Sequence, residues 1–149
     1  MCLYTTSKKV RVAKEDMDCY KVMVEYSGDN GWWMSPYQGM AYKEGHTYEL
    51  GEQLQLMDVS ETPKELRYPY KVEEGFHSFT NSTDALSFRN ALEARFSRLS
   101  IRQYTYVIVK CIIPKESVYV EGSYFDWGNN FPSFCSEKIV CEGKIESGY

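Results

Sequence analysis

The stretch at residues 104–113, YTYVIVKCII, constrains the fold most strongly, because it is apolar on both faces of an extended strand. Successive side chains of a strand point to opposite faces of the sheet. The apolar side chains divide between these faces, with Ile108 and Ile112 on one and Val107, Val109 and Ile113 on the other. A strand with two apolar faces is typical of the centre of a sheet, so this segment is predicted to be a central strand.

Other segments also carry the period-two pattern of strands. Residues 18–27 alternate well, with Tyr20, Val22, Val24 and Tyr26 on one face and Cys19, Lys21, Met23 and Glu25 on the other. Further strands are expected at residues 8–13, 46–50, 70–79 with a break near Gly75, 117–121 and 137–144. Residues 51–70 and the aromatic stretch at 122–132 are predicted to be loops.

One helix is expected at residues 83–99. Ser82 or Thr83 can cap its first turn, and Asp84 lies near the positive end of the helix dipole. An apolar stripe at helical spacing is predicted to face the core, and consists of Ala85, Phe88, Leu92, Phe96 and Leu99. Together these elements predict an α+β fold. We expect a single domain over residues 1–149, with a mostly antiparallel sheet and one main helix packed on it.

Composition restricts the compartment and the class of partner. The net charge of −4 argues against a general nucleic-acid binder, because such proteins are normally basic. The five cysteines are an odd number without a Cys-x-x-Cys pair, and the two histidines, His46 and His77, lie far apart in sequence. We find no signal peptide and no apolar run of membrane-spanning length. We therefore expect a cytoplasmic protein with free thiols, no cofactor and no metal site.

The sequence GFHSF at residues 75–79 is the most distinctive local motif. A histidine beside an aromatic residue and a serine, just before a helix, can bind or protonate a ligand. This makes His77 and Ser78 candidate ligand-binding residues. The alternative is a half-buried histidine that is satisfied by a backbone partner.

Charged side chains supply two more candidates. Arg95, Arg98 and Arg102 lie near one helix face, and arginine suits bidentate recognition of phosphate or carboxylate groups. The alternative is a solvated helix face that complements the helix dipole. Glu137 shares a strand face with apolar neighbours, so it lies either at the wet end of the strand or in a cleft. A cleft would raise its pKa and make it a possible acid, base or ion-pair partner.

Aromatic residues make up 15% of the chain and include 13 Tyr, which favours sheet structure and suits a wet pocket or a partner surface. An exposed patch of them would mark an interaction site for another protein or a second copy. The residues expected in such a patch are Trp32, Trp33, Tyr37, Phe125, Trp127 and Phe131.

Three segments in order, QGMAYKEGHTY at 38–48, GFHSF at 75–79 and VIVKCIIPKESVYVEG at 107–122, resemble a family of small uncharacterised domains of phages and mobile elements. That family has a GfH motif followed by a short helix and a strand, and the resemblance covers roughly residues 19–122. It implies a phage-like or mobile-element origin, and host cytoplasm as the location. No activity comes with it.

A looser similarity is to ADP-ribosyltransferases. Those enzymes place an Arg or His on an early strand, a Ser-Thr-Ser-like segment before a helix and a Glu on a late strand. The matching positions here are Tyr20-Lys21, Ser78-Phe79-Thr80 and Glu137. Lys21 stands in place of the Arg or His, and Phe79 interrupts the serine-threonine segment. The similarity implies a catalytic role for Glu137.

Three hypotheses of function follow. The first is a binding module that sequesters a nucleotide-derived ligand in anti-defence, with aromatic rings stacking on a base and arginines holding phosphate. Its ligand-binding residues would be Tyr37, His46, His77, Ser78, Arg95, Arg98 and Trp127. The second is an ADP-ribosyltransferase-like enzyme. The third is a protein–protein interaction domain whose partner is a host protein or a second copy of the chain.

Overall fold

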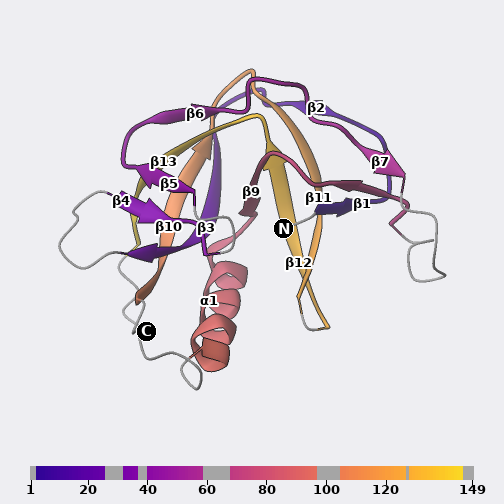
Figure 1. The fold of residues 1–149 in the computed structure, drawn as a ribbon. Coiled ribbons are helices and arrows are strands. Elements are labelled where there is room, and N and C mark those ends of the chain that lie inside the picture. Colours follow the sequence, from indigo (N-terminus) through magenta and orange to yellow (C-terminus); the bar gives the residue numbers. More distant parts are fainter. Residues whose placement is uncertain are drawn as a thin grey trace.

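The computed structural model describes residues 3–25, 32–36, 40–58, 68–96, 105–126 and 128–145, and all statements below concern these residues (Figure 1). The side chain of Phe96 is also outside this set. Among the expected site residues, Tyr37, Arg98 and Trp127 fall outside the described residues, as do the predicted end of the helix at Leu99 and the arginine at 102.

The described elements are strands, with one helix. The strands before the helix are β1 (Leu3–Thr5), β2 (Arg11–Val12), β3 (Met17–Glu25), β4 (Trp32–Met34), β5 (Ala41–Lys43), β6 (Thr47–Glu49), β7 (Met57–Asp58), β8 (Tyr70–Val72) and β9 (Phe76–Phe79). The helix α1 spans Ser82–Phe96. The strands after it are β10 (Thr105–Ile113), β11 (Val118–Asp126), β12 (Asn129–Ser136) and β13 (Lys138–Lys144).

The described strands form one 13-stranded antiparallel sheet, in the order β6-β13-β10-β3-β9-β12-β11-β1-β8-β7. Short strands extend this path: β2 pairs with β11, β4 with β3, and β5 with β4. Figure 1 shows the sheet folded over as an arch, with β13, β10 and β3 on one side, β12 and β11 on the other, and α1 below. The predicted α+β class, with an antiparallel sheet and one main helix, is therefore confirmed.

The strand predicted to be central is central. β10 lies between β3 and β13, and pairs with β3 over its whole length from Thr105↔Glu25 to Ile113↔Met17. One face of β3 and β10 contributes Cys19, Met23, Val107 and Val109 to a first core cluster. The opposite face contributes Val22, Val24 and Ile108 to a second cluster beneath α1. Two apolar faces thus correspond to two cores, because the sheet is covered on both sides there.

The helix packs on the second core through its apolar stripe. Ala85, Phe88 and Leu92 are all almost fully buried, and the Phe88 ring contacts that of Phe79 at a centroid distance of 5.3 Å. The expected stripe is confirmed for these three residues. No helix in the described part of the chain is long and apolar enough to span a membrane.

The N-cap of α1 is Asn81, which precedes both of the predicted caps, Ser82 and Thr83. Asn81 Oδ1 accepts the backbone N–H of Asp84 at 2.8 Å, and Asn81 Nδ2 donates to the Asp84 carboxylate at 2.8 Å. Ser82 is already the first helical residue, so neither it nor Thr83 is the cap. The prediction was wrong because it overlooked Asn81, whose amide pairs reciprocally with the third residue of the helix.

Apart from Trp127, which lies outside the described residues, residues 122–132 do not form the predicted loop. They belong to the long hairpin of β11 and β12, which pair from Tyr119↔Ser136 to Asp126↔Asn129. Gly122 suggested a loop, but it lies in a strand that β1 approaches closely. A Cβ at this position would meet the Tyr4 carbonyl oxygen at 2.2 Å, so only glycine allows the contact. Tyr124 and Phe131 pair directly across the hairpin, and both pack on the second core.

The predicted strand at residues 8–13 is reduced to β2, because only Val12 and Arg11 pair, with Val118 and Tyr119 at the start of β11. The predicted strand at 70–79 with a break near Gly75 is confirmed as β8 and β9. The predicted loop at residues 51–70 contains β7, and Tyr70 at its end opens β8.

Candidate functional site

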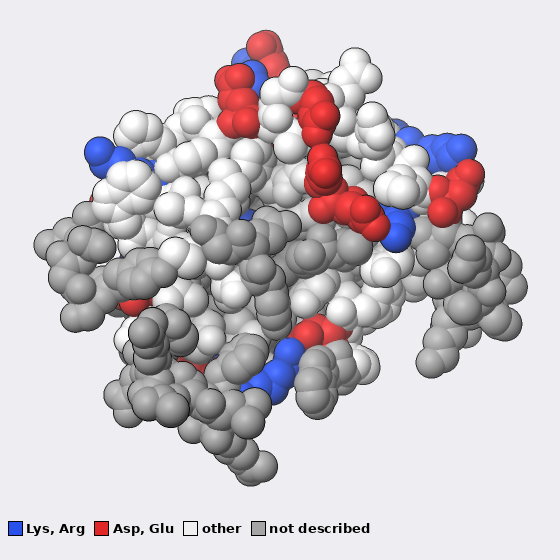
Figure 2. Space-filling view, viewed as in Figure 1, with Lys and Arg blue, Asp and Glu red and all other residues white. Residues whose placement is uncertain are grey.

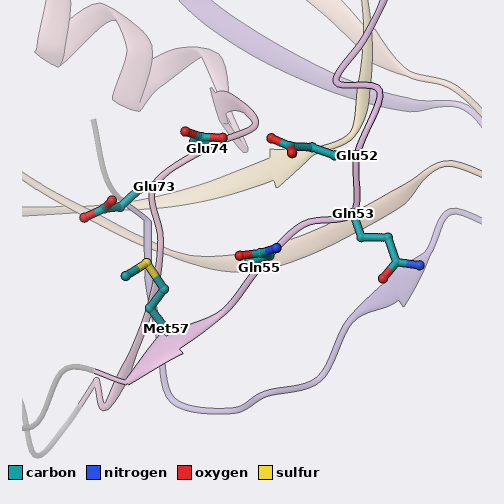
Figure 3. A pocket seen from close by; sticks show the side chains of 6 residues that line it. All are labelled: Glu52, Gln53, Gln55, Met57, Glu73 and Glu74. Carbon is teal, nitrogen blue, oxygen red and sulfur yellow. The ribbon is translucent and has the colours of Figure 1, made fainter.

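A pocket of about 160 Å³ lies between the segment that precedes β7 and the turn that joins β8 to β9. Figure 3 shows its lining side chains, and the carboxyl ends of Glu52 and Glu74 are turned toward each other. The lining residues are Glu52, Gln53, Gln55, Met57, Glu73 and Glu74. Three carboxylates, two carboxamides and a thioether thus surround the pocket.

Packing beneath the pocket explains why these two segments meet. β7 pairs with β8 through Met57↔Lys71, which places the segments side by side. Leu54 turns inward and is buried in a third core cluster together with Val72. Gly75 has a φ of +144°, and a Cβ there would lie 2.8 Å from the Leu54 Cδ2 atom, so glycine lets the turn close over this core.

The carboxyl groups of the pocket differ in electrostatic environment. The pKa of Glu74 is raised, first by its hydrogen bond with the Glu52 carboxyl and then by the negative charge of Glu52. The pKa of Glu73 is lowered by Lys71, whose Nζ lies 2.7 Å from Glu73 Oε1. Among the described residues, no lysine or arginine forms an ion pair with Glu52 or Glu74. These two carboxylates therefore face each other without a compensating cation from that part of the chain.

The side chains that line the pocket offer oxygen acceptors to an organic cation. No group of three or more His, Cys, Asp or Glu side chains in the described part of the chain is placed to hold a metal. An ammonium or guanidinium group can donate several hydrogen bonds at once to carboxylate and carboxamide oxygens. Figure 2 shows acidic side chains gathered in a band across one face of the molecule, which adds to the negative field on that side.

His77 and Ser78 lie on β9 and are both buried. The ring of His77 contacts two backbone carbonyl oxygens, with Nδ1 3.2 Å from that of Gly75 and Nε2 3.3 Å from that of Val72. The pKa of His77 is lowered from 6.5 to about 4, mainly by burial and then by the positive charge of Lys21. His77 therefore has backbone partners, as in the alternative of a half-buried histidine that is satisfied by the backbone. It is more deeply buried than that alternative supposed.

Lys21 lies on the face of β3 that contributes Cys19 and Met23 to the first core cluster, and its Nζ donates a hydrogen bond to the His77 carbonyl oxygen. The same Nζ lies 5.3 Å from the centre of the buried Tyr42 ring. Ser78 is on this side of β9, because Phe76 faces the first core cluster and Phe79 the second. The Ser78 hydroxyl is buried and has no hydrogen-bond partner in the described structure.

The other expected ligand-binding residues do not join this group. Arg95, in the last turn of α1, forms an ion pair with the buried Asp126 at the end of β11. His46 is exposed in the turn between β5 and β6, with its ring 6.4 Å from that of Tyr48. Of the described members of the expected set, only His77 and Ser78 are adjacent, and none lines the acidic pocket.

The residues matched to ADP-ribosyltransferases do not form one site. Tyr20 packs against the second core cluster, on the face of the sheet opposite to Ser78. Glu137 lies in the bend between β12 and β13, where its Oε1 accepts the backbone N–H of Val118 at 3.0 Å. The Glu137 carboxylate thus fastens the start of β11, and neither side chain faces a substrate position shared with Ser78.

The aromatic residues expected in an exposed patch are divided between core and surface. Trp33 and Phe131 are buried, whereas Trp32 and Phe125 keep 42% and 40% of their surface exposed. Phe125 packs against Tyr4 and Tyr68 at centroid distances of 5.7 and 5.0 Å. Trp32 lies near Lys43 instead, so the described aromatics form no single patch.

The acidic pocket was missed because its residues come from two segments about twenty positions apart in the sequence. One signal was present: Gln53, Leu54, Gln55 and Leu56 alternate between polar and apolar, as in an extended segment over a core. No protein-family model matches the chain, and comparison with curated proteins and with solved structures finds no significant match. The resemblances to phage domains and to ADP-ribosyltransferases therefore stay predictions.

Proposed function

We propose that this chain is a binding module that holds a cationic side chain, lysine or arginine, of a partner protein in the pocket between Glu52 and Glu74. The observation that carries this proposal is the facing pair of carboxyl groups, which has no cation partner in the described part of the chain. The negative charge of Glu52 opposes ionisation of Glu74, and a cation between the two carboxyl groups relieves that repulsion. The resemblance to phage and mobile-element domains makes a host protein the proposed partner.

Size and position support this assignment. The pocket volume of about 160 Å³ suits one long side chain rather than a whole nucleotide. β7 is the last strand of the described sheet order, so an extended partner segment can lie beside it while one of its side chains enters the pocket. The net charge of −4 favours encounter with a basic partner and disfavours encounter with an anionic one.

The test is a fluorescence-anisotropy titration of the full chain with a labelled arginine-containing peptide, and with the same peptide carrying glutamine in place of arginine. The double variant Glu52→Gln/Glu74→Gln removes both facing charges. The matched control, Glu93→Gln/Glu121→Gln, removes two exposed charges from α1 and β11. We expect the pocket variant to lose roughly tenfold or more in affinity and the control to bind like the unmodified chain. Equal losses of affinity in both variants would mean that net charge, and not the pocket, determines binding, and would overturn the proposal.

A nucleotide-derived ligand is the second proposal, and a different observation favours it. The Lys21 ammonium forms no ion pair with a carboxylate in the described structure, and it bonds the carbonyl of His77, the residue before Ser78, whose hydroxyl has no hydrogen-bond partner there. An ammonium and a hydroxyl are suitable donors to a phosphate oxygen. A thermal-shift series with nucleotides, NAD and ADP-ribose tests this second site, and a melting temperature unchanged by all of them contradicts it.

A further inference from the structure

Three cysteines lie at one level of the sheet, on three neighbouring strands. Cys111 on β10 is paired with Cys19 on β3 and, on its other side, with Cys141 on β13. All three are fully buried in the first core cluster. The pairing with β13 shifts register between Lys110 and Cys111, and this shift brings Cys141 opposite Cys111.

The distance between the two thiols suits a covalent bond after a small movement. The Sγ atoms of Cys111 and Cys141 are 3.5 Å apart. Residues directly opposite in an antiparallel pair have Cα atoms about 4.5–5.5 Å apart, which lies within the range of about 4.4–6.8 Å found for disulfides. Side-chain rotation can therefore bring the sulfur atoms together while the backbone keeps its pairing.

The two thiols are also electrostatically different. The Cys111 S–H donates toward the Cys141 sulfur, and this hydrogen bond, together with the nearby Lys21 charge, lowers the pKa of Cys141 against the effect of its burial. Burial raises the pKa of Cys111 well above its usual value. Because a thiolate is the reactive form of cysteine, Cys141 is the nucleophile of the pair and Cys111 the partner that follows.

We propose that Cys111 and Cys141 are an oxidisable dithiol, which hydrogen peroxide converts into a disulfide within the chain. The Cys141 sulfur attacks one peroxide oxygen, the O–O bond breaks, and a sulfenic acid and a water molecule form. The Cys111 sulfur then attacks the Cys141 sulfur and displaces the hydroxyl group as a second water. Two electrons pass from the thiols to hydrogen peroxide, and the two thiol protons leave in the two water molecules.

The surroundings restrict which oxidant can reach the pair. Both sulfur atoms are fully buried, which excludes bulky disulfides such as oxidised glutathione in the folded state. Lys21, whose charge acts on Cys141, is only partly buried. On its outer side β13 pairs with β6, a strand of three residues, so a local opening there disturbs few backbone hydrogen bonds. Hydrogen peroxide is small and uncharged, and fits both restrictions.

The test uses the reduced full chain, treated with hydrogen peroxide, then alkylated under denaturing conditions and mapped by mass spectrometry of its peptides. We expect one crosslinked peptide pair containing Cys111 and Cys141, lighter by two hydrogens and released by dithiothreitol. Recovery of both residues in alkylated form, or their separate oxidation to sulfonic acid, would overturn the proposal. A crosslink between Cys111 and Cys19 would overturn the choice of Cys141 as nucleophile.

Variants separate chemistry from folding. Lys21→Met is expected to slow disulfide formation several-fold, whereas Lys110→Met, which removes an exposed lysine of the same strand as Cys111, leaves the rate unchanged. An unaltered rate in Lys21→Met would contradict the role of the Lys21 charge. Cys135→Ser is the matched cysteine control, because Cys135 is buried in the third core cluster, and it is expected to keep the crosslink. The mapping of the unmodified chain decides the proposal even where a variant fails to fold.

Discussion

The Nζ atom of Lys21 donates a hydrogen bond to the carbonyl oxygen of His77, beside the one position where β3 and β9 pair, Tyr20↔Phe79. The Lys21 side chain thus supplies a hydrogen-bond donor that a backbone N–H would supply if β3 and β9 paired over more residues. Removing it leaves a carbonyl of a buried residue without this partner, which typically costs about 1–3 kcal/mol.

Lys21→Met is accordingly expected to lower the free energy of unfolding by about 1–3 kcal/mol in urea denaturation. Lys110→Met serves as control, because its ion pairs with Asp18 and Glu142 are exposed to solvent and contribute little to stability. A Lys21→Met protein as stable as the control would show that water replaces the ammonium without loss.

The buried His77 makes the stability of the fold depend on pH. Its pKa is lowered from 6.5 to about 4, so the unfolded chain binds a proton more readily than the folded one between these values. The stability is therefore fully present above pH 6.5 and is lost as the pH falls toward 4. A shift of this size corresponds to about 3 kcal/mol.

Urea denaturation at a series of pH values measures this dependence. The His77→Gln variant is expected to have a flatter profile than the unmodified chain between pH 4 and 6.5. The exposed His46 gives the control, and His46→Gln should keep the slope. If His77→Gln retains the full slope, the carboxyl groups of the chain, and not His77, are responsible for it.

The contact between Gly122 and β1 sets a strict limit on side-chain size. A Cβ at position 122 would lie 2.2 Å from the Tyr4 carbonyl oxygen and 2.8 Å from Leu3 Cδ2, so Gly122→Ala forces β1 away from β11. We expect a loss of about 1–3 kcal/mol in thermal or urea denaturation. Gly143→Ala, where the nearest atom is 3.5 Å away, should be tolerated, and similar losses in both variants would contradict the contact.

The cap of α1 gives a test that separates neighbouring residues. Asn81→Ala removes both reciprocal contacts with Asp84 and should cost about 1 kcal/mol of stability. Ser82→Ala replaces an exposed helical residue with a good helix former, and should be close to neutral. A larger loss of stability in Ser82→Ala than in Asn81→Ala would identify Ser82 as the N-cap.

Local periodicity made the two-core sheet predictable. The alternation in β3 and the apolar faces of β10 both reflect burial along a single strand, which neighbouring residues in sequence report directly. The helix stripe at Ala85, Phe88 and Leu92 followed for the same reason. The β11–β12 hairpin was missed because Gly122 and Pro132 are turn-forming residues. Gly122 is accommodated in the strand because β1 approaches it closely at Tyr4, which the local sequence does not report.

Functional sites were less predictable than helices and strands, because the residues of a site come from distant segments that only the folded sheet brings together. Arg95 was a reasonable anion-binding candidate until the end of β11 placed Asp126 beside it. Glu137 was a candidate for catalysis, yet its carboxylate accepts the backbone N–H of Val118. Glu52 and Glu74 lie in a segment predicted to be a loop and in a broken strand, and only the pairing of β7 with β8 brings these together.

An amide-resolved NMR titration with an arginine-containing peptide tests whether the cationic side chain binds in the pocket between Glu52 and Glu74. We expect chemical-shift changes concentrated at residues 52–57 and 73–74, saturating at a single stoichiometric site and absent in Glu52→Gln/Glu74→Gln. Changes scattered over acidic residues throughout the surface, or equal changes in the double variant, would contradict it.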